Sequence, residues 1–492
     1  MNKHIFKYLV IGVFFALTLW SCENFLDKQP LDSPSKATFW KTEADATMGL
    51  AACYGRLNND CTGATNGGGS LHHSGGMTDE GYAQYPWEGG YTNVPRGIIE
   101  ATTGGVLSNF WYNSYRGITT CNVFLENIDA IPMADALKSV MKGEVLFLRA
   151  FWYNYLTALY GDCPLIIKVL SVEESMKLKR TPKAEVVTQI LKDLDAAIAL
   201  LPDKIYAGNA VKGSAQALKA RVCLYNEKWA DAATAAKAVM DNPLYALHPD
   251  FLAMCNGNAE NGNKEILFSV KYLAPDVIHG LDYEHGSWFS STPIQDYVDF
   301  FEKLPGWDAA NPFEKRDPRL KLTVLVPGAP FPYVKTGDVF VPSLNAGKTL
   351  YGLIKFIKTV SSSSTNCDQD IILLRLADVM LMYAEAKLKG GQNDASALKA
   401  LNDVRARFGN VLVPKTTLDM NAIMYERKVE LGFEGLRFFD IRRWKIGTQA
   451  MTGLKDPVAK DYTFNESKHY LWPIPQAEIN VMGKVFGQNP GY

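Results

Sequence analysis

The sequence is poor in the residues and motifs that most metal and catalytic sites need. It has seven histidines and eight cysteines in 492 residues, with no Cys-x-x-Cys pair. It contains no His-Glu-x-x-His zinc motif and no Gly-x-Ser-x-Gly nucleophile elbow. Its 51 basic residues do not exceed its 52 acidic residues, so it lacks the positive charge typical of a nucleic-acid-binding protein. We therefore predict no cofactor, no metal site and no nucleic-acid partner.

The N-terminus has the layout of a secretion signal. Lys3, His4 and Lys7 precede an uncharged run, Tyr8–Trp20, which at 13 residues falls short of the about 20 that a membrane-spanning helix needs. The run ends at Ser21-Cys22, a small residue before a cysteine. This pattern predicts a lipoprotein signal peptide over residues 1–21 and lipid acylation of Cys22, with an uncleaved anchor or plain secretion as alternatives. No later segment is long and apolar enough to cross a membrane.

Most of the mature chain shows helical periodicity. In Glu144–Tyr160 apolar residues recur every three or four positions, and the other faces are also largely apolar, so we expect a buried helix. Residues 211–242 read as two helices joined near Glu227, close to the length of a tetratricopeptide repeat. Residues 371–408 read as a second pair, with Ile372 on the stripe of its first helix. The sequence predicts a mainly α fold built on helix pairs, forming a single unit over residues 22–492.

Two stretches interrupt the helices. Residues 60–108 hold 12 of the 39 glycines, and residues 275–342 hold nine of the 24 prolines. Both are rich in aromatic residues, which argues against disorder and favours functional loops. Short strands are predicted at Ile266–Val270 and Leu322–Val326. The remaining cysteines, 53 and 61 included, are expected to be buried free thiols, with a Cys53–Cys61 disulfide as the alternative.

Several motifs, in order along the chain, resemble those of one family. They are LFLRAFWYNY at 146–155, LYGDCPL at 159–165, KRDPRL at 315–320, LLRLADVMLMYAE at 373–385, ERKVELGFEG at 426–435, RFFDIRRW at 437–444, LWPIP at 471–475 and the terminal QNPGY at 488–492. Together with the Ser21-Cys22 start, these segments resemble the SusD/RagB family of nutrient-uptake lipoproteins. The resemblance runs from residue 21 to residue 492 and weakens in the two loop-rich stretches.

The resemblance implies both an architecture and a function. The implied fold has about four tetratricopeptide-like helix pairs, forming a right-handed helical scaffold that is packed against a loop-rich irregular half with few short strands. The implied location is the outer membrane, where Cys22 anchors the protein to lipid on the cell-surface side. The implied partner is a SusC-like TonB-dependent transporter. The implied ligand is an oligosaccharide, although relatives of the RagB type handle peptides.

Aromatic residues in the two loop-rich stretches are the predicted ligand site. A sugar ring packs its C–H face on a flat aromatic ring, and nearby polar side chains bind the hydroxyl groups. The predicted stacking residues are Trp87, Trp288 and Trp307, followed by Tyr85 and Tyr283, and the predicted polar contacts are Asp79, Asn93 and Arg96. The alternative for each ring is burial under its own loop. Trp111 and Tyr115 share a helical stripe with Ile118 and are expected in the core.

The charged C-terminal motif has two possible interpretations. Glu430 and Glu434 lie one helical turn apart and are followed by several arginines, so they form either a structural ion-pair network or the two carboxylates of a surface glycoside hydrolase. We favour the network, and with it a protein that is not an enzyme. His72 and His73, in a glycine-rich stretch, are expected in a surface loop.

Overall fold

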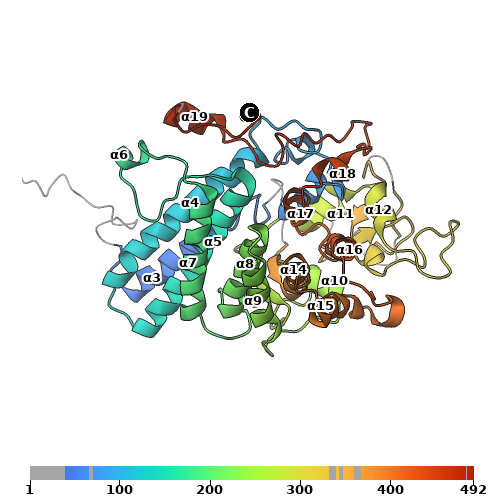
Figure 1. Ribbon diagram of the computed structural model, residues 1–492, viewed down its shortest axis with the longest axis horizontal. Coiled ribbons are helices and arrows are strands. Elements are labelled where there is room, and N and C mark those ends of the chain that lie inside the picture. The colour runs from blue at the N-terminus through green and yellow to red at the C-terminus, as the bar shows by residue number, and fades with distance from the viewer. Residues whose placement is uncertain (1–38, 66–69, 332–338, 343–346, 359–366, 484) are drawn as a thin grey trace, which may run out of the picture.

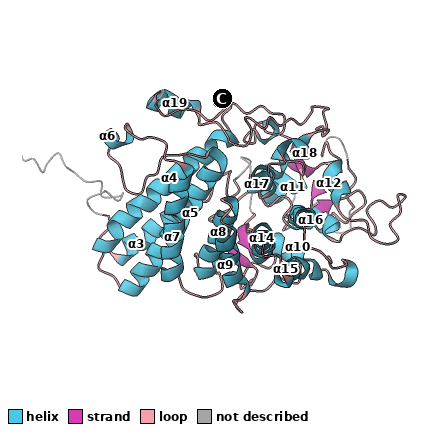
Figure 2. Ribbon diagram, in the orientation of Figure 1, coloured by secondary structure: helices cyan, strands magenta, loops and turns pink. Residues whose placement is uncertain are grey.

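The computed structural model describes residues 39–65, 70–331, 339–342, 347–358, 367–483 and 485–492. The predicted signal peptide and Cys22 lie outside these residues, and their processing stays a prediction. Helices dominate, and the strands are few and short, as Figure 2 shows in magenta. The predicted mainly α fold is confirmed.

A frame of long helices runs from one side of the molecule across its middle (Figure 1). Along the chain these helices are α3 (Glu43–Gly55), α4 (Val106–Asn127), α5 (Asp135–Tyr160), α7 (Lys183–Leu200), α8 (Lys212–Tyr225), α9 (Trp229–Met240), α14 (Leu376–Lys389), α15 (Ala395–Ala406) and α16 (Met420–Glu430). From α4 to α9 each packs on the next in this order, and α9 then packs on α14 and α14 on α15 (Figure 1). These are the tetratricopeptide-like pairs. Buried alanines on α9, such as Ala232 and Ala236, allow its close approach to neighbours.

The remaining elements are short, and most of them belong to the irregular half. They are η1 (Leu71–Met77), β1 (Gly81–Ala83), η2 (Tyr91–Asn93), η3 (Ile128–Ala130), α6 (Val172–Ser175), α10 (Phe251–Cys255), β2 (Ile266–Val270), α11 (Leu281–Gly286), β3 (Ser291–Pro293), α12 (Gln295–Phe300), α13 (Arg319–Thr323), β4 (Val324–Leu325), β5 (Gly352–Leu353), β6 (Ile371–Arg375), η4 (Gly409–Val411), α17 (Arg437–Arg443), α18 (Gly447–Met451) and α19 (Gln476–Met482). Helices α9 and α14 pack on each other. The chain segment between them therefore leaves the helical frame after α9 and returns to it beside α9.

The structure corrects the start of the second predicted helix pair. Ile371–Arg375 is strand β6, which pairs antiparallel with β2 from Val270↔Ile371 to Ile266↔Arg375. Ile372 therefore lies in a strand, and the helix begins at Leu376. Branched residues favour strands, but a short apolar run has no period that separates the two structures. Strand β2 has its predicted bounds, whereas only Val324–Leu325 of the second predicted strand is extended.

The described cysteines are free and buried, and Cys53 and Cys61 do not pair. This result agrees with the prediction of buried thiols. In the part of the chain that the structure describes, no helix has both the length and the apolar content needed to span a membrane.

Candidate functional site

A two-stranded sheet brings the two loop-rich stretches together. Strand β1 pairs antiparallel with β3, with Gly81 opposite Pro293 and Ala83 opposite Ser291. The Gln84 backbone N–H extends the ladder by donating to the Ser290 carbonyl at 2.7 Å. The residues just after β1 and just before β3 therefore lie at the same end of the sheet, although they are about 200 positions apart in the sequence.

Four of the five predicted aromatic residues meet at this end. Tyr85 and Trp87 are stacked, with ring centroids 4.7 Å apart and planes at 28°. Trp288 stands edge-on to Tyr85 at 5.8 Å and contacts Tyr283 at 5.4 Å. We call these four residues the aromatic shelf. Trp87 is 70% exposed and Trp288 is 36% exposed, so two indole rings are open to solvent on a surface that the other two rings support.

Hydrogen bonds hold the shelf in place. The Tyr85 hydroxyl donates to the Trp288 carbonyl at 3.2 Å, and the Gln84 amide donates to the Tyr85 hydroxyl at 2.8 Å. The Lys348 N–H donates to the Gln84 side-chain oxygen at 3.2 Å. Ordered rings lose little conformational entropy when a ligand packs on them. The shelf is therefore preorganised.

A strained residue separates the exposed ring from a small buried core. Phe289 has a φ of 53°, which is unusual for a residue with a side chain. Its ring is buried in a cluster with Leu325, Phe331, Phe340 and Ile357, while its neighbour Trp288 faces solvent. Strained conformations persist where the surrounding packing fixes them, and they gather at functional sites.

A buried carboxyl group follows Trp87 of the shelf directly in the sequence. Glu88 accepts a hydrogen bond from the Ser290 hydroxyl at 2.9 Å. Burial raises the pKa of Glu88 to about 7, although the Ser290 hydrogen bond opposes this. Its ionisation is thus costly in the folded protein.

This pKa predicts a pH-dependent effect of Glu88→Gln. A pKa raised above the unfolded value contributes stability at low pH that is lost as the pH rises through 7. The neutral amide can still accept from Ser290. We expect Glu88→Gln to match the wild type near pH 5 and to exceed its free energy of unfolding by about 1–2 kcal/mol near pH 8. Thermal denaturation across this range measures the difference. The exposed Glu173→Gln serves as the control, and an equal pH trend in both variants would refute the assignment.

Trp307 does not join the shelf. Among the described residues its recorded partners are local: its indole Nε1 donates to the Pro312 carbonyl at 3.2 Å, and the Lys303 ammonium lies 3.8 Å from its ring centroid. It is half-buried. A role in stacking on the ligand stays a prediction for this ring.

Asp79, a predicted polar ligand contact, lies in a buried ion-pair cluster. It is 6% exposed, and its carboxylate accepts from Arg437 at 2.7 and 2.8 Å and from Lys428 at 2.8 Å. Burial alone would raise the pKa of Asp79, but the two cations hold it well below its usual range. Both carboxylate oxygens therefore already accept hydrogen bonds from Arg437 or Lys428 inside the protein. Proximity in sequence to the aromatic residues did not place it on the same surface.

The two other predicted polar contacts are half-buried. Arg96 donates from Nε to Asp456 at 2.8 Å, and its Nη2 also pairs with this buried carboxylate. This ion pair ties the loop to a turn near residue 456. Asn93 ends η2 close to the shelf in sequence, and its ligand role stays a prediction.

The histidines expected in a surface loop are buried. Helix η1 is covered along its whole length, and His72 stacks on Phe356 with centroids 3.6 Å apart. The glycines explain this burial, because they let the helix pack closely on its neighbours. A Cβ at Gly75, for example, would lie 2.3 Å from the Phe433 ring. The glycines of this stretch serve close packing here rather than an exposed loop.

The C-terminal acids form the predicted ion-pair network. Arg375 contacts Glu265 and Glu430 at 2.9 Å and Glu434 at 2.7 Å, all with buried side chains. Lys355 contacts Glu434 at 2.6 Å, and Arg319 contacts Glu430 at 3.3 Å. Burial alone would raise the pKa of Glu430, but Arg407, Arg375 and Arg319 lower it to about 2. The structural interpretation of Glu430 and Glu434 is confirmed.

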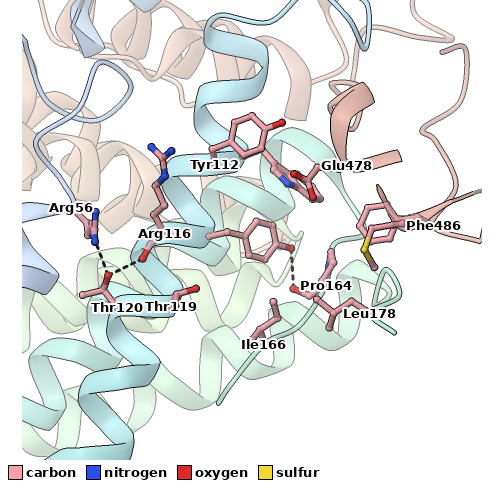
Figure 3. A pocket seen from close by; sticks show the side chains of 13 residues that line it. Arg56, Tyr112, Arg116, Thr119, Thr120, Pro164, Ile166, Leu178, Glu478 and Phe486 are labelled. Carbon is pink, nitrogen blue, oxygen red and sulfur yellow. Dashed lines mark hydrogen bonds between the residues drawn. The ribbon is translucent and has the colours of Figure 1, made fainter. Parts of the chain in front are cut away.

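A separate hollow lies beside α4. Its volume is about 420 Å³, and Figure 3 shows its side chains converging from α4 on one side and from Glu478 and Phe486 on the other. Trp111 forms a buried wall, as predicted for the core, whereas Tyr115 is half-buried and donates to the Pro164 carbonyl at 3.0 Å. Arg56 donates to the Thr120 hydroxyl at 3.0 Å at the rim. This hollow shares no lining residue with the shelf.

Fold and site together define a mainly helical protein whose tetratricopeptide-like frame carries an exposed aromatic surface. Two family models match the chain, one described as "SusD family" over residues 254–492 and one as "Starch-binding associating with outer membrane" over residues 69–224. The chain belongs to the SusD-like family.

Individual relatives are similar over nearly the whole chain. The SusD-like protein P2 of Formosa agariphila is 26% identical and aligns over 99% of this chain and 100% of its own length. A crystal structure of a SusD-like protein from Bacteroides fragilis has a TM-score of 0.80 at 27% identity, covering 94% of this chain and 100% of that one. A structure described as a laminarin-binding SusD-like protein has a TM-score of 0.77 at 26% identity, covering 92% and 100%.

Proposed function

We propose that this protein captures oligosaccharides at the cell surface on the aromatic shelf and delivers them, chemically unchanged, to a SusC-like TonB-dependent transporter. The observation that carries the proposal is the exposure of Trp87 and Trp288 on a preorganised surface. The description of a similar structure as laminarin-binding and the starch-binding description of one matching family model support a glycan ligand. The outer-membrane wording of that family description supports the location.

The shelf suits a sugar ligand for physical reasons. The Trp87 and Trp288 rings offer flat apolar area to the C–H face of a pyranose, at about 1 kcal/mol per ring beyond simple burial. Contacts of this size give single-site affinities in about the micromolar to millimolar range. Useful capture then needs several sugar units bound at once, which favours oligosaccharides over single sugars.

Titration calorimetry of the purified protein tests the ligand class. The probes are laminarin, starch and xylan oligosaccharides, with unrelated peptides as the second arm. Saturable binding of at least one glycan series, tightening with chain length, is the expected result. Binding of peptides alone would replace the proposal with the peptide-uptake function of RagB-type relatives. Release of reducing ends during incubation would instead indicate a surface glycoside hydrolase.

Membrane attachment depends on Cys22 in this proposal. Because Cys22 is the predicted acylation site, Cys22→Ala removes the acyl chains, each of whose buried methylenes contributes about 0.8 kcal/mol to membrane binding. We expect the variant to move from the membrane fraction to the soluble fraction on cell fractionation. The control is Cys53→Ala, which changes a buried thiol and leaves the protein in the membrane. Retention of the Cys22 variant in the membrane would refute lipidation.

A further inference from the structure

A second cavity lies where frame helices meet the C-terminal motif. It has a volume of about 390 Å³ and lies at the ends of α5, α8, α14 and α17. Its lining includes Tyr225, Trp229, Trp444 and Tyr470, and it shares no residue with the aromatic shelf. This volume lies within the range of small-molecule sites.

Two buried hydrogen-bond donors at this cavity lack acceptors. Arg442 is 6% exposed, and its Nε has no hydrogen-bond partner among the described residues. The Tyr225 hydroxyl, on the same lining, has none there either. A guanidinium can only donate hydrogen bonds, and buried donors are nearly always paired. Arg442 Nε therefore lacks an acceptor, and the Tyr225 hydroxyl can donate to the same kind of group.

The cavity also has an excess of positive charge. Lys183, Lys389, Arg442, Arg443 and Lys445 line it, against Glu227 and Glu385. Glu385 is already committed, because it accepts from Arg443 at 2.7 Å and from the Trp444 indole at 2.7 Å. In the described part of the chain, no ion pair within 4.0 Å involves Arg442. A buried cation without a counterion is unusual.

The positions of two of these cations at helix ends explain only part of the positive charge around the cavity. Lys389 and Arg443 close α14 and α17, where cations interact favourably with the helix dipole. Arg442 also donates from Nη1 to the Phe438 carbonyl at 3.2 Å, and its guanidinium lies 3.3 Å from the Phe438 ring centroid. These contacts leave Nε unsatisfied.

Lys445 adds a positive charge from a strained backbone conformation. It adopts a φ of 58°, a left-handed conformation that glycine usually fills after a helix. In this position its ammonium lies 4.0 Å from the Tyr470 ring centroid on the cavity wall. The chain thus places a lysine, at some conformational cost, on the lining of the cavity that also holds Arg442 and Tyr225.

We propose that this cavity is a second binding site, for a small ligand that carries an oxyanion: a carboxylate, sulfate or phosphate group. The oxyanion accepts from Arg442 and Tyr225 and is surrounded by the lysines, while the Trp229 and Trp444 rings pack on the body of the ligand. Charge-assisted hydrogen bonds of this kind are stronger than those between neutral groups.

The test is calorimetry on the purified protein with sodium sulfate, sodium phosphate, sodium glucuronate and neutral glucose, at ionic strength fixed with sodium chloride. Arg442→Met keeps the packing on Phe438 and removes the charge. Tyr225→Phe keeps the stacking on Phe439 and removes only the hydroxyl. Lys399→Met, on the exposed surface, is the control for a single lost charge.

We expect saturable binding of at least one anion and none of glucose. Affinity should fall by about tenfold or more in Arg442→Met and by a smaller factor in Tyr225→Phe, and it should not change in Lys399→Met. Tighter binding of glucuronate than of the inorganic ions would assign an acidic sugar as the source of the oxyanion, and equal binding would assign the anion alone. Absence of saturable binding, or an unchanged affinity in both cavity variants, would overturn the proposal. Neutral glycan binding on the shelf does not depend on this result.

Discussion

Arg375→Met is expected to lower the free energy of unfolding by about 3–5 kcal/mol. Removing one partner of a buried ion pair leaves an uncompensated charge, and Arg375 faces three carboxylates, those of Glu265, Glu430 and Glu434, all almost fully buried. Arg319 and Lys355 remain and each contacts one of these acids, Glu430 and Glu434 respectively, while Arg407 still contacts Glu265 at 2.8 Å and Glu430 at 3.3 Å. Chemical denaturation monitored by circular dichroism measures the loss.

The pH dependence of this loss identifies its cause. An acid whose pKa is lowered in the fold contributes stability above its unfolded pKa, and the contribution is lost as the pH falls. Arg407, Arg375 and Arg319 outweigh burial and lower the pKa of Glu430 to about 2 in the folded protein. Removing Arg375 raises this pKa, so the defect should be largest above pH 5 and smaller near pH 3. The control is Lys399→Met, whose exposed pair with Asp403 should contribute under about 1 kcal/mol. A similar small loss in both variants would contradict the network.

The double variant Trp87→Ala, Trp288→Ala is expected to weaken glycan binding by about 30- to 1,000-fold, or about 2–4 kcal/mol. Both indoles are exposed on the shelf, so their loss removes ligand contact while most of the core is unchanged. The melting temperature should fall by only about 2–4 °C, because Trp288 also contacts Tyr85 and Tyr283. Calorimetry and thermal denaturation of the same samples separate the two effects.

Two further variants sharpen this experiment. Val172→Ala changes an 82% exposed apolar side chain on α6 and should leave affinity unchanged. Trp307→Ala tests whether the ligand extends beyond the shelf, because this ring stands apart. Unchanged glycan affinity in the double variant would remove the shelf from the proposed function.

The sequence predicted the helical frame because its periodicity is local. Glu144–Tyr160 and Ala397–Val404 repeat apolar residues at helical spacing, and both segments are helical. Ile371–Arg375 was misassigned because five apolar or charged residues contain too little periodicity. Its strand conformation depends on pairing with β2, about 100 residues earlier, which no local pattern encodes.

The sequence indicated which aromatic residues to choose, but not that four of them lie together. Tyr85, Trp87, Tyr283 and Trp288 could be chosen for their residue type, but only the β1–β3 ladder brings them together. The same limitation applies to the placement of Asp79. Its neighbours in sequence suggested a polar contact, whereas Arg437 and Lys428, about 350 residues later, hold it inside the protein.

The ladder between β1 and β3 also sets a condition on maturation. Because Trp87 and Trp288 come from segments about 200 residues apart in the chain, the aromatic shelf does not exist until both segments have been synthesised and have docked. A chain that ends before β3 contains Tyr85 and Trp87 but has no assembled shelf. Assembly of the shelf therefore requires that these two distant segments have folded together.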